Sequence, residues 1–243
     1  DKYDVDGIEY DWMRQIFIFP EGTERRNAPL LTDFHRRTRL LLDEAGKRRG
    51  RRLLLSARVP DSLKECTEFG YAVEQWIRQG LVDYIVPSGF GNMDFNVRVE
   101  DFRKLTEGTD CRVYPAVNLW PGPCRLTKSG GWRPEHYYAA AHNYYGFGAD
   151  GIATYNYYYA SMEDRLPKLF DLTPITDPTV LARQFRDYLF WRRLPGRTPH
   201  SSRSQPRTRT APAGTSSCRQ CCAARARLRF PQPRARAQRS RPQ

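Results

Sequence analysis

Short apolar runs alternate with longer segments of helical periodicity along residues 1–194. The apolar runs predict five strands, at Val5–Trp12, Leu53–Val59, Val82–Pro87, Arg112–Leu119 and Asp150–Tyr158. The other segments predict helices at Thr32–Lys47, Ala72–Gln79, Val99–Glu107, Pro134–Phe147, Glu163–Phe170 and Pro178–Trp191. Capping residues support these bounds, because Thr32 or Asp33 can begin the first helix and Gly46 or Gly50 can end it.

The repeated order of strand and helix indicates an α/β fold in which helical crossovers join parallel strands. A doubly wound open sheet and a (β/α) barrel both satisfy this order. No G-x-G-x-x-G segment follows a predicted strand, whereas polar residues collect at the carboxyl ends of several strands, where barrel enzymes place their sites. We therefore predict a partial (β/α)8 TIM barrel of about five βα units in residues 1–194. Because eight units close such a barrel, we expect about three more before Asp1.

Residues 195–243 differ in composition from the rest of the chain. Of the 40 Lys and Arg residues, 12 Arg lie in this tail, which has no acidic residue, so 28 basic residues remain against 27 acidic ones in residues 1–194. The formal net charge of +13 therefore belongs almost entirely to the tail. A segment rich in Arg, Pro, Ser and Ala cannot form a core and is predicted to be disordered. Our main hypothesis is that the tail is a frameshift product, and the alternative is an Arg-rich arm that binds nucleic acid.

Several common classes of partner have no support in the sequence. No run of 18 or more apolar residues predicts a transmembrane helix. Cys218 and Cys221 form a lone C-x-x-C pair without the further ligands of a zinc site, and no pair of histidines has metal spacing. We therefore expect no metal, no cofactor and no membrane partner. Since the chain is expected to begin within a longer protein, the compartment stays open, and secretion or a periplasmic location is compatible with it.

Two carboxylates in the first predicted strand are the strongest candidates for catalysis. Side chains alternate along a strand, so Glu9 and Asp11 share one face, and Tyr10 and Trp12 share the other. The acidic face should point into the barrel rather than into an apolar helix layer, with the two carboxylates roughly 7 Å apart. Such a pair is suited to proton transfer, although a salt bridge to Arg14 or Arg58 at the barrel rim is the structural alternative.

Other polar and aromatic residues fall near the carboxyl ends of the remaining predicted strands. In the second strand, Ser56 and Arg58 share a face, and Arg58 lies where it can hold a carboxylate or a substrate hydroxyl. The loop Ser88–Asn96 is rich in glycine and carries Asp94, which makes it a candidate site loop. The residues that suit sugar recognition, by hydrogen bonding or by stacking on a pyranose face, are Asn118, Trp120, Asn156 and Tyr158.

The segment DVDGIEYDWMR, residues 4–14, resembles strand four of bacterial glycoside-hydrolase-like TIM barrels, the family-10-like glycosyl hydrolases. Four further segments are similar to the same family: NAPLLTDFHRR, LVDYIVPS, TDCRVYPAVN and GADGIATYNYY. The resemblance covers about residues 3–160 and implies strands four to eight of the barrel. It also implies a carbohydrate substrate and hydrolysis by acid/base catalysis.

The first strand is also similar to the D-G-x-D-x-D-x-E strand of family-18 chitinases. Asp6, Glu9 and Asp11 occupy the three acidic positions, but Met13 stands where that family has its proton-donating Glu. The segment RVYPAVNLW also lacks the strand-seven nucleophile Glu of the large clan of retaining glycosidases. Asp11 and Glu9 are therefore the candidate acids, and the second carboxyl group is either Asp94 or part of the units expected before Asp1.

The sequence thus predicts a fragment of a glycoside hydrolase acting on oligo- or polysaccharide, with Asp11 or Glu9 as acid/base or nucleophile and with Arg14 and Arg58 orienting them. A non-catalytic carbohydrate-binding barrel and a nucleic-acid-binding protein that uses the Arg-rich tail are the alternatives. Five strands leave two open edges of the sheet, so the fragment on its own is expected to be inactive. The sugar, the linkage and the oligomeric state are left open.

Overall fold

The computed structural model describes residues 3–89, 95, 97–118, 133–157 and 171–186. Its strands are β1 (Gly7–Asp11), β2 (Leu54–Pro60), β3 (Tyr84–Ser88), β4 (Arg112–Val113), β5 (Ala116–Asn118) and β6 (Ala153–Tyr155). Its α-helices are α1 (Glu24–Arg49), α2 (Leu63–Glu68), α3 (Val73–Arg78), α4 (Val99–Thr106), α5 (Pro134–Gly146) and α7 (Pro178–Leu181), and its 3-10 helices are η1 (Trp12–Arg14) and η2 (Thr173–Thr176). The predicted helix Glu163–Phe170 and the tail 195–243 lie outside the described residues.

All strand pairs of the described chain are parallel. One sheet has the order β1-β2-β3-β4, and β5 pairs with β6 in a second, two-stranded sheet. At least one helix stands between the two strands of each pair, as parallel pairing requires. The α/β fold with a parallel sheet is therefore confirmed.

The predicted strand Arg112–Leu119 is divided at Pro115 into β4 and β5. Proline has no backbone N–H to donate, so the ladder is interrupted there. On one side of this segment, Tyr114 N donates to the carbonyl of Ile85 in β3 at 2.9 Å. On the other side, Ala153 N of β6 donates to the carbonyl of Pro115 at 3.1 Å. Residues 112–118 thus lie between β3 and β6 and link the two sheets.

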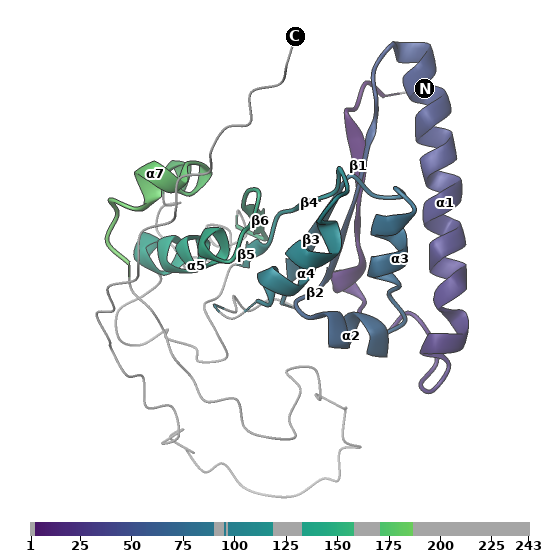
Figure 1. Cartoon of the computed structure of the whole chain (residues 1–243), viewed down its shortest axis with the longest axis horizontal. Helices are drawn as coiled ribbons and strands as arrows, with labels where there is room; N and C mark the ends of the chain where they lie inside the picture. The colour runs from purple at the N-terminus through teal and green to yellow at the C-terminus, as the bar shows by residue number, and fades with distance from the viewer. Residues whose placement is uncertain (1–2, 90–94, 96, 119–132, 158–170, 187–243) are drawn as a thin grey trace, which may run out of the picture.

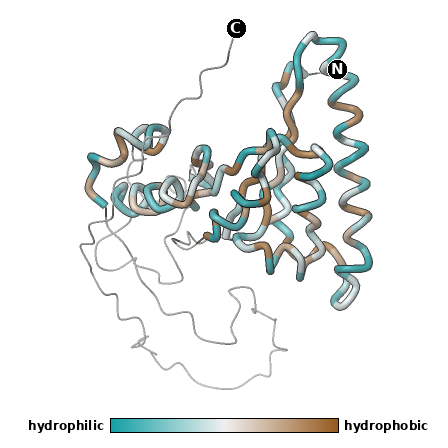
Figure 2. The backbone as a smooth tube through the Cα atoms, viewed as in Figure 1, coloured by the Kyte–Doolittle hydropathy of each residue, from teal (hydrophilic) through white to brown (hydrophobic). Residues whose placement is uncertain are grey.

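The core lies between the strands and the helices that cover one face of the larger sheet. In Figure 1, α1 runs along one flank of the strands, and α5 and α7 lie at the opposite end of the molecule. Leu55, Ala57 and Val59 of β2 are completely buried in this core together with Trp76 of α3 and Phe102 of α4. Figure 2 shows apolar residues concentrated along the central strands and alternating with polar ones along α1. No helix in the described ranges is both long and apolar enough to cross a bilayer.

Helix α1 begins eight residues before the predicted start at Thr32. Thr23 is its N-cap residue, and the helix continues through Pro29. The Thr32 hydroxyl does not cap an N-terminus but donates to the carbonyl of Ala28 at 3.4 Å, one turn earlier. The C-terminus is as predicted, because Gly50 ends the helix at φ 66°, a conformation that favours glycine.

Two short helices differ from the prediction. Helix α2 was not predicted, although Ser62 accepts from Glu65 N at 3.3 Å in the Ser-x-x-Glu pattern of a helix start. Helix α7 ends at Leu181 rather than continuing through the described residues of the predicted helix Pro178–Trp191. There the guanidinium of Arg186 donates to the carbonyls of Leu181 and Ala182, which satisfies the end of the helix.

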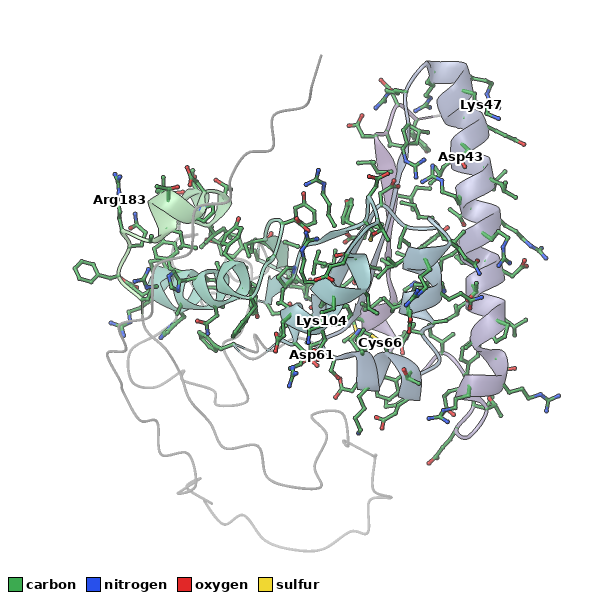
Figure 3. All side chains as sticks on the ribbon, viewed as in Figure 1. Asp43, Lys47, Asp61, Cys66, Lys104 and Arg183 are labelled. Carbon is green, nitrogen blue, oxygen red and sulfur yellow. The ribbon has the colours of Figure 1, made fainter. Side chains whose placement is uncertain are left out.

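Asp83, at the amino end of β3, is bonded to β2 through both its backbone and its side chain, and we call this arrangement a latch. Asp83 N donates to the Leu55 carbonyl at 2.7 Å, and Asp83 Oδ2 accepts from Leu55 N at 2.7 Å. The buried Arg39 of α1 donates to the same carboxylate at 2.9 Å, to Asp43 and to the Leu53 carbonyl. Side chain and backbone together therefore join α1, β2 and β3 at the start of the strands. Asp43, the partner of Arg39 on α1, is labelled in Figure 3.

The same arrangement recurs between β4 and the start of β6. Asp150, before β6, donates through its N–H to the Val113 carbonyl at 2.9 Å and accepts from Val113 N at 3.0 Å. Arg103 of α4 pairs with its carboxylate at 3.4 Å. Both latches lie at the amino ends of the strands, which leaves the carboxyl ends free for other chemistry.

Candidate active site

The two predicted catalytic carboxylates lie on one face of β1, which runs beside β2. In the register of these strands, Glu9 is opposite Ser56 and Asp11 is opposite Arg58. The Ser56 hydroxyl donates to Glu9 Oε2 at 2.8 Å, and Arg58 Nη1 donates to Asp11 Oδ1. The structure therefore brings together the residues predicted to share this face, with Arg58 as the partner of Asp11.

The alternate residues of this segment point into the helix layer. The hydroxyl of Tyr10 is 2.9 Å from Thr38 Oγ1 of α1, and Trp12 Nε1 donates to His35 Nε2 at 3.1 Å. The two aromatic side chains bury apolar surface against α1. This packing fixes which face β1 presents, so the carboxylates of Glu9 and Asp11 are held on the opposite side.

Arg58 is the centre of the site and only 2% exposed. Besides Asp11, its guanidinium contacts Ser88 Oγ, to which Nε donates at 3.1 Å, and the Gly89 carbonyl, to which Nη2 donates at 3.3 Å. A guanidinium carries its donors in a planar fork, so partners from β1 and from the end of β3 hold it in one orientation. Its positive charge is thus kept beside Asp11 and away from bulk water.

Asn118, at the end of β5, is completely buried and extends this set of contacts. Its Nδ2 donates to the Gly89 carbonyl at 3.1 Å, and its Oδ1 lies 3.1 Å from Ser88 Oγ. The donors form a consistent chain, since Arg58 donates to the Ser88 oxygen and the Ser88 hydroxyl can donate to Asn118. The predicted site residue Asn118 therefore contacts the same residues as Arg58, and its role toward a ligand stays a prediction.

Tyr155 of β6 completes the arrangement and was not predicted. The guanidinium carbon of Arg58 lies 3.3 Å from the centroid of its ring, a cation–π contact. Asn118 and Tyr155 are register partners, so both side chains belong to the same face. The predicted site residue Asn156 does not share this face: β6 ends at Tyr155, and Asn156 follows at φ 54°.

We call these residues the Arg58 network. Its members are Asp11, Arg58, Ser88, Gly89, Asn118 and Tyr155. They come from the carboxyl ends of β1, β2, β3, β5 and β6 or from the residue that follows. Residues at the ends of β1, β3 and β6 contact the Arg58 guanidinium directly, and Asn118 of β5 contacts it through Ser88 and Gly89. The carboxyl edge of a parallel sheet is where α/β proteins bind their ligands.

The two carboxylates differ in how they are held. Asp11 Oδ1 accepts from Arg58 and also from Met13 N at 3.1 Å, whereas Glu9 has a single hydroxyl donor in Ser56. The Asp11 side chain is 36% exposed, and Glu9 is exposed as well, so both can meet a ligand. Asp11 is thus a fixed carboxylate with charged and backbone donors, and Glu9 is the less constrained of the pair.

The remaining predicted site residues fall into two groups. Arg14 lies exposed in η1, and Asp11 takes its guanidinium partner from Arg58 instead. Asp94, Trp120 and Tyr158 lie outside the described residues. Arg58 makes most of the interactions of the network. Its ion pair with Asp11 is the structural alternative considered above, and its role toward a substrate stays a prediction.

Other reactive groups in the described chain are remote from the Arg58 network or inert. A groove between α2, α3 and α4 is lined by residues such as Leu63, Tyr71 and Arg78 and includes no member of the network. Cys66 also lines this groove, and burial raises the pKa of its thiol, which favours the protonated form at neutral pH. The described residues hold no group of three or more side chains suited to a metal ion.

Comparison with known proteins assigns no family and no function to these residues. A scan against models of protein families and a search of curated proteins both found no match.

Proposed function

We propose that the described strands belong to a (β/α)8 barrel in which β1 is not an edge. The support is the order of parallel strands, with helical structure between the two strands of each pair, and the position of residues 112–118 between β3 and β6. Within the described residues, β1 pairs with β2 alone. Parallel strands are normally paired and covered on both sides, so a further strand beside β1 fits this topology.

Apolar side chains on the outer side of α1 support the same proposal. Leu30, Phe34 and Leu41 recur at i, i+4 and i+11, which places them on one stripe of the helix. All three are exposed, Leu30 and Leu41 to 63% and 66%. Phe34 contacts Tyr10 of β1, so this stripe adjoins the strand that has the unpaired edge. A neighbouring strand–helix unit would cover both.

We propose further that the site is that of a glycoside hydrolase acting on oligo- or polysaccharide. The observation that carries this proposal is the pair Glu9 and Asp11 on one face of β1, beside a buried guanidinium at the carboxyl edge of the sheet. Glycoside hydrolysis uses two carboxyl groups of different protonation, one that donates a proton and one that is ionised. The site offers two carboxylates with different partners.

The hydrogen bonds suggest which carboxylate has which role. Asp11 is bonded by a guanidinium and a backbone N–H, and both favour the carboxylate anion as acceptor. Asp11 would therefore act as the ionised group, either attacking the sugar or activating water. Glu9, with one hydroxyl donor, would be the proton donor to the glycosidic oxygen.

The test is turnover of a panel of aryl glycosides, with release of reducing sugar from polysaccharides, by an intact homologue that supplies the strand–helix units expected beside β1, and by its variants at the positions that match Glu9, Asp11 and Glu44. We expect Asp11→Asn and Glu9→Gln to lower kcat/KM about 10²-fold or more, because each removes one carboxylate of the pair. Glu44→Gln, which changes an exposed carboxylate on α1, is the matched control and should keep full activity. Full activity in Asp11→Asn would remove the site assignment.

A non-catalytic carbohydrate-binding protein is the second candidate. One observation favours it: Arg58 pairs with Asp11 and donates hydrogen bonds to Ser88 and Gly89. These contacts stabilise the structure and would be equally useful in a protein without catalytic activity. Glycan binding that is weakened by Asp11→Asn but occurs without turnover would decide for this candidate. Nucleic-acid binding through residues 195–243 stays a prediction, tested by whether salt-sensitive affinity for RNA or DNA is lost when those residues are deleted.

A further inference from the structure

A histidine lies at the centre of the aromatic packing behind β1. The His35 side chain of α1 is completely buried. Its ring stacks on Trp76 of α3 with the centroids 4.1 Å apart, and Tyr10 and Phe34 meet it edge-on. A buried histidine in such surroundings is usually an apolar spacer, but the hydrogen bonds of this ring give it a more specific role.

The two ring nitrogens have different environments. Nε2 accepts the indole N–H of Trp12 at 3.1 Å, and because an indole nitrogen only donates, Nε2 must be unprotonated. The proton of the neutral ring is then on Nδ1, which is buried and has no hydrogen-bond partner in the described structure. A second proton could only go to Nε2, where it would face the N–H of Trp12. The contact therefore exists with the neutral imidazole alone.

Trp12 connects this ring to the candidate site. It is the residue after Asp11 and the first residue of η1, and the next N–H, that of Met13, donates to Asp11 Oδ1. A second anchor is Tyr71, whose hydroxyl lies 2.8 Å from the carbonyl of Ile16 and 3.4 Å from the carbonyl of Trp12, so it holds the backbone of this segment. The indole of Trp12 is thus the side chain that ties the start of η1, and with it the Met13 N–H, to α1.

We propose that His35 is a positioning residue for Asp11, which it holds through Trp12, and that protonation of its ring releases this anchor. The proposal relies on the proposed function only in treating Asp11 as a site residue. Acid would open the Trp12–His35 contact, move η1 and remove the Met13 donor from Asp11. The site would then lose its geometry at a pH at which the rest of the sheet is still folded.

No group that faces His35 in the described structure supplies a negative charge to compensate a second proton on its ring. From β1 the titratable group is Tyr10, while η1 and α3 present the indoles of Trp12 and Trp76, which do not ionise. On α1 itself, Arg39 is directed to Asp43, Asp83 and the Leu53 carbonyl. Consistent with this, burial lowers the pKa of His35 to about 4.

The experiment follows assigned ¹H–¹⁵N resonances of the whole chain from pH 6.5 to pH 3.5. The Trp12 indole N–H reports the anchor, the Met13 amide reports the site, and the Ile85 amide of β3 reports the sheet. In the wild type we expect the Trp12 and Met13 signals to shift together, with one midpoint near pH 4, while Ile85 keeps its position. A transition in which all three signals move together would be global unfolding and would overturn the proposal.

Two variants separate positioning from packing. His35→Gln keeps an acceptor near the position of Nε2 but cannot be protonated, so Trp12 and Met13 should keep their neutral-pH signals and lose the acid transition. His35→Phe keeps a ring against Trp76 but has no acceptor, so both signals should be displaced at every pH. His142→Gln, on the half-buried histidine of α5, is the matched control and should retain the wild-type transition.

The outcomes are decisive and independent of enzymatic turnover. An acid transition of Trp12 and Met13 that persists in His35→Gln would overturn the proposal, even if His35→Phe does not fold. A Met13 signal unchanged in a folded His35→Phe would also overturn it. Because these signals require no substrate, failure of the glycoside hydrolase assignment would leave them unaffected, and their failure would leave that assignment standing.

Discussion

Two buried arginines stand at opposite ends of the strands and differ in what they hold. Arg39, at the amino end, binds Asp83, whose side chain is 14% exposed, together with Asp43 and a backbone carbonyl. Arg58, at the carboxyl end, binds Asp11, whose side chain is 36% exposed. Both guanidinium groups are enclosed. The exposed partner of Arg39, Asp43, lies on the same helix, whereas the carboxylate that Arg39 binds on another element, Asp83, is largely enclosed and the one that Arg58 binds is open to a ligand. The Arg39–Asp83 pair therefore joins elements of the fold, whereas the Arg58–Asp11 pair holds a carboxylate where a ligand can reach it.

The largest effect should come from breaking the pair at the amino end. Arg39→Met leaves the Asp83 carboxylate and the Leu53 carbonyl without their buried donor, so we expect it to lower the free energy of unfolding by about 3 kcal/mol. Arg52 still pairs with Asp83, so the loss should lie near the lower end of the range that is typical when one partner of a buried ion pair is removed. Urea titration of the whole chain measures the change. Arg37→Met, at an exposed ion pair on the same helix, should cost less than 1 kcal/mol.

Lowering the pH should reduce the free energy of unfolding by a similar amount, and the residue responsible should be His35 rather than either arginine. His35 has a pKa lowered to about 4 in the fold against an ordinary value of 6.5, so the unfolded chain binds its proton first as the pH falls. Stability from this residue is complete above pH 6.5, declines as the pH falls and reaches its full loss of about 3 kcal/mol below pH 4. Urea titrations at several pH values should show this decline, and His35→Gln should remove it. An unchanged slope in His35→Gln would assign the decline to other groups.

At the carboxyl end, Arg58→Met should cost less stability than Arg39→Met but should damage the site more. Asp11 can be hydrated when its partner is removed, so we expect a loss of about 2 kcal/mol from the hydrogen bonds to Ser88, Gly89 and Asp11. Glycan binding or turnover should be abolished in Arg58→Met and retained in a folded Arg39→Met. If Arg39→Met impaired the site as much as Arg58→Met, the distinction between the two ends would not hold.

The residues at the two ends of the strands can be predicted from the sequence only where side chains alternate regularly along a strand. Alternation along β1 and β2 is uninterrupted, so it placed Glu9, Asp11 and Arg58 on one face. In β6 the strand ends at Tyr155, and Asn156 takes a left-handed conformation, so the same rule selected the wrong neighbour. Alternation describes only residues with extended backbone, and the length of a strand depends on tertiary pairing.

The latches at the amino end could have been predicted only in part. Asp83 and Asp150 both immediately precede or lead into a strand, in LVDYIVP and GADGIAT, which is a recurrent sequence signal. The partners Arg39 and Arg103 lie on helices distant in sequence, and nothing in local periodicity links them to these aspartates. The division of one predicted strand at Pro115 follows from the missing N–H of proline, a signal that was visible in the sequence.

The smallest effect should come from the second latch at the amino end, and its size tests whether the two latches are equivalent. Asp150→Asn keeps an amide oxygen to accept from Val113 N, and the lost charge affects only Arg103, which pairs at 3.4 Å and is partly exposed. We expect a loss of about 1 kcal/mol by urea titration. Asp83→Asn should cost clearly more, because its carboxylate serves the buried Arg39 as well as Arg52 and Leu55 N. Equal losses would mean that the backbone bond, common to both latches, supplies the stability and that the buried arginine adds little to it.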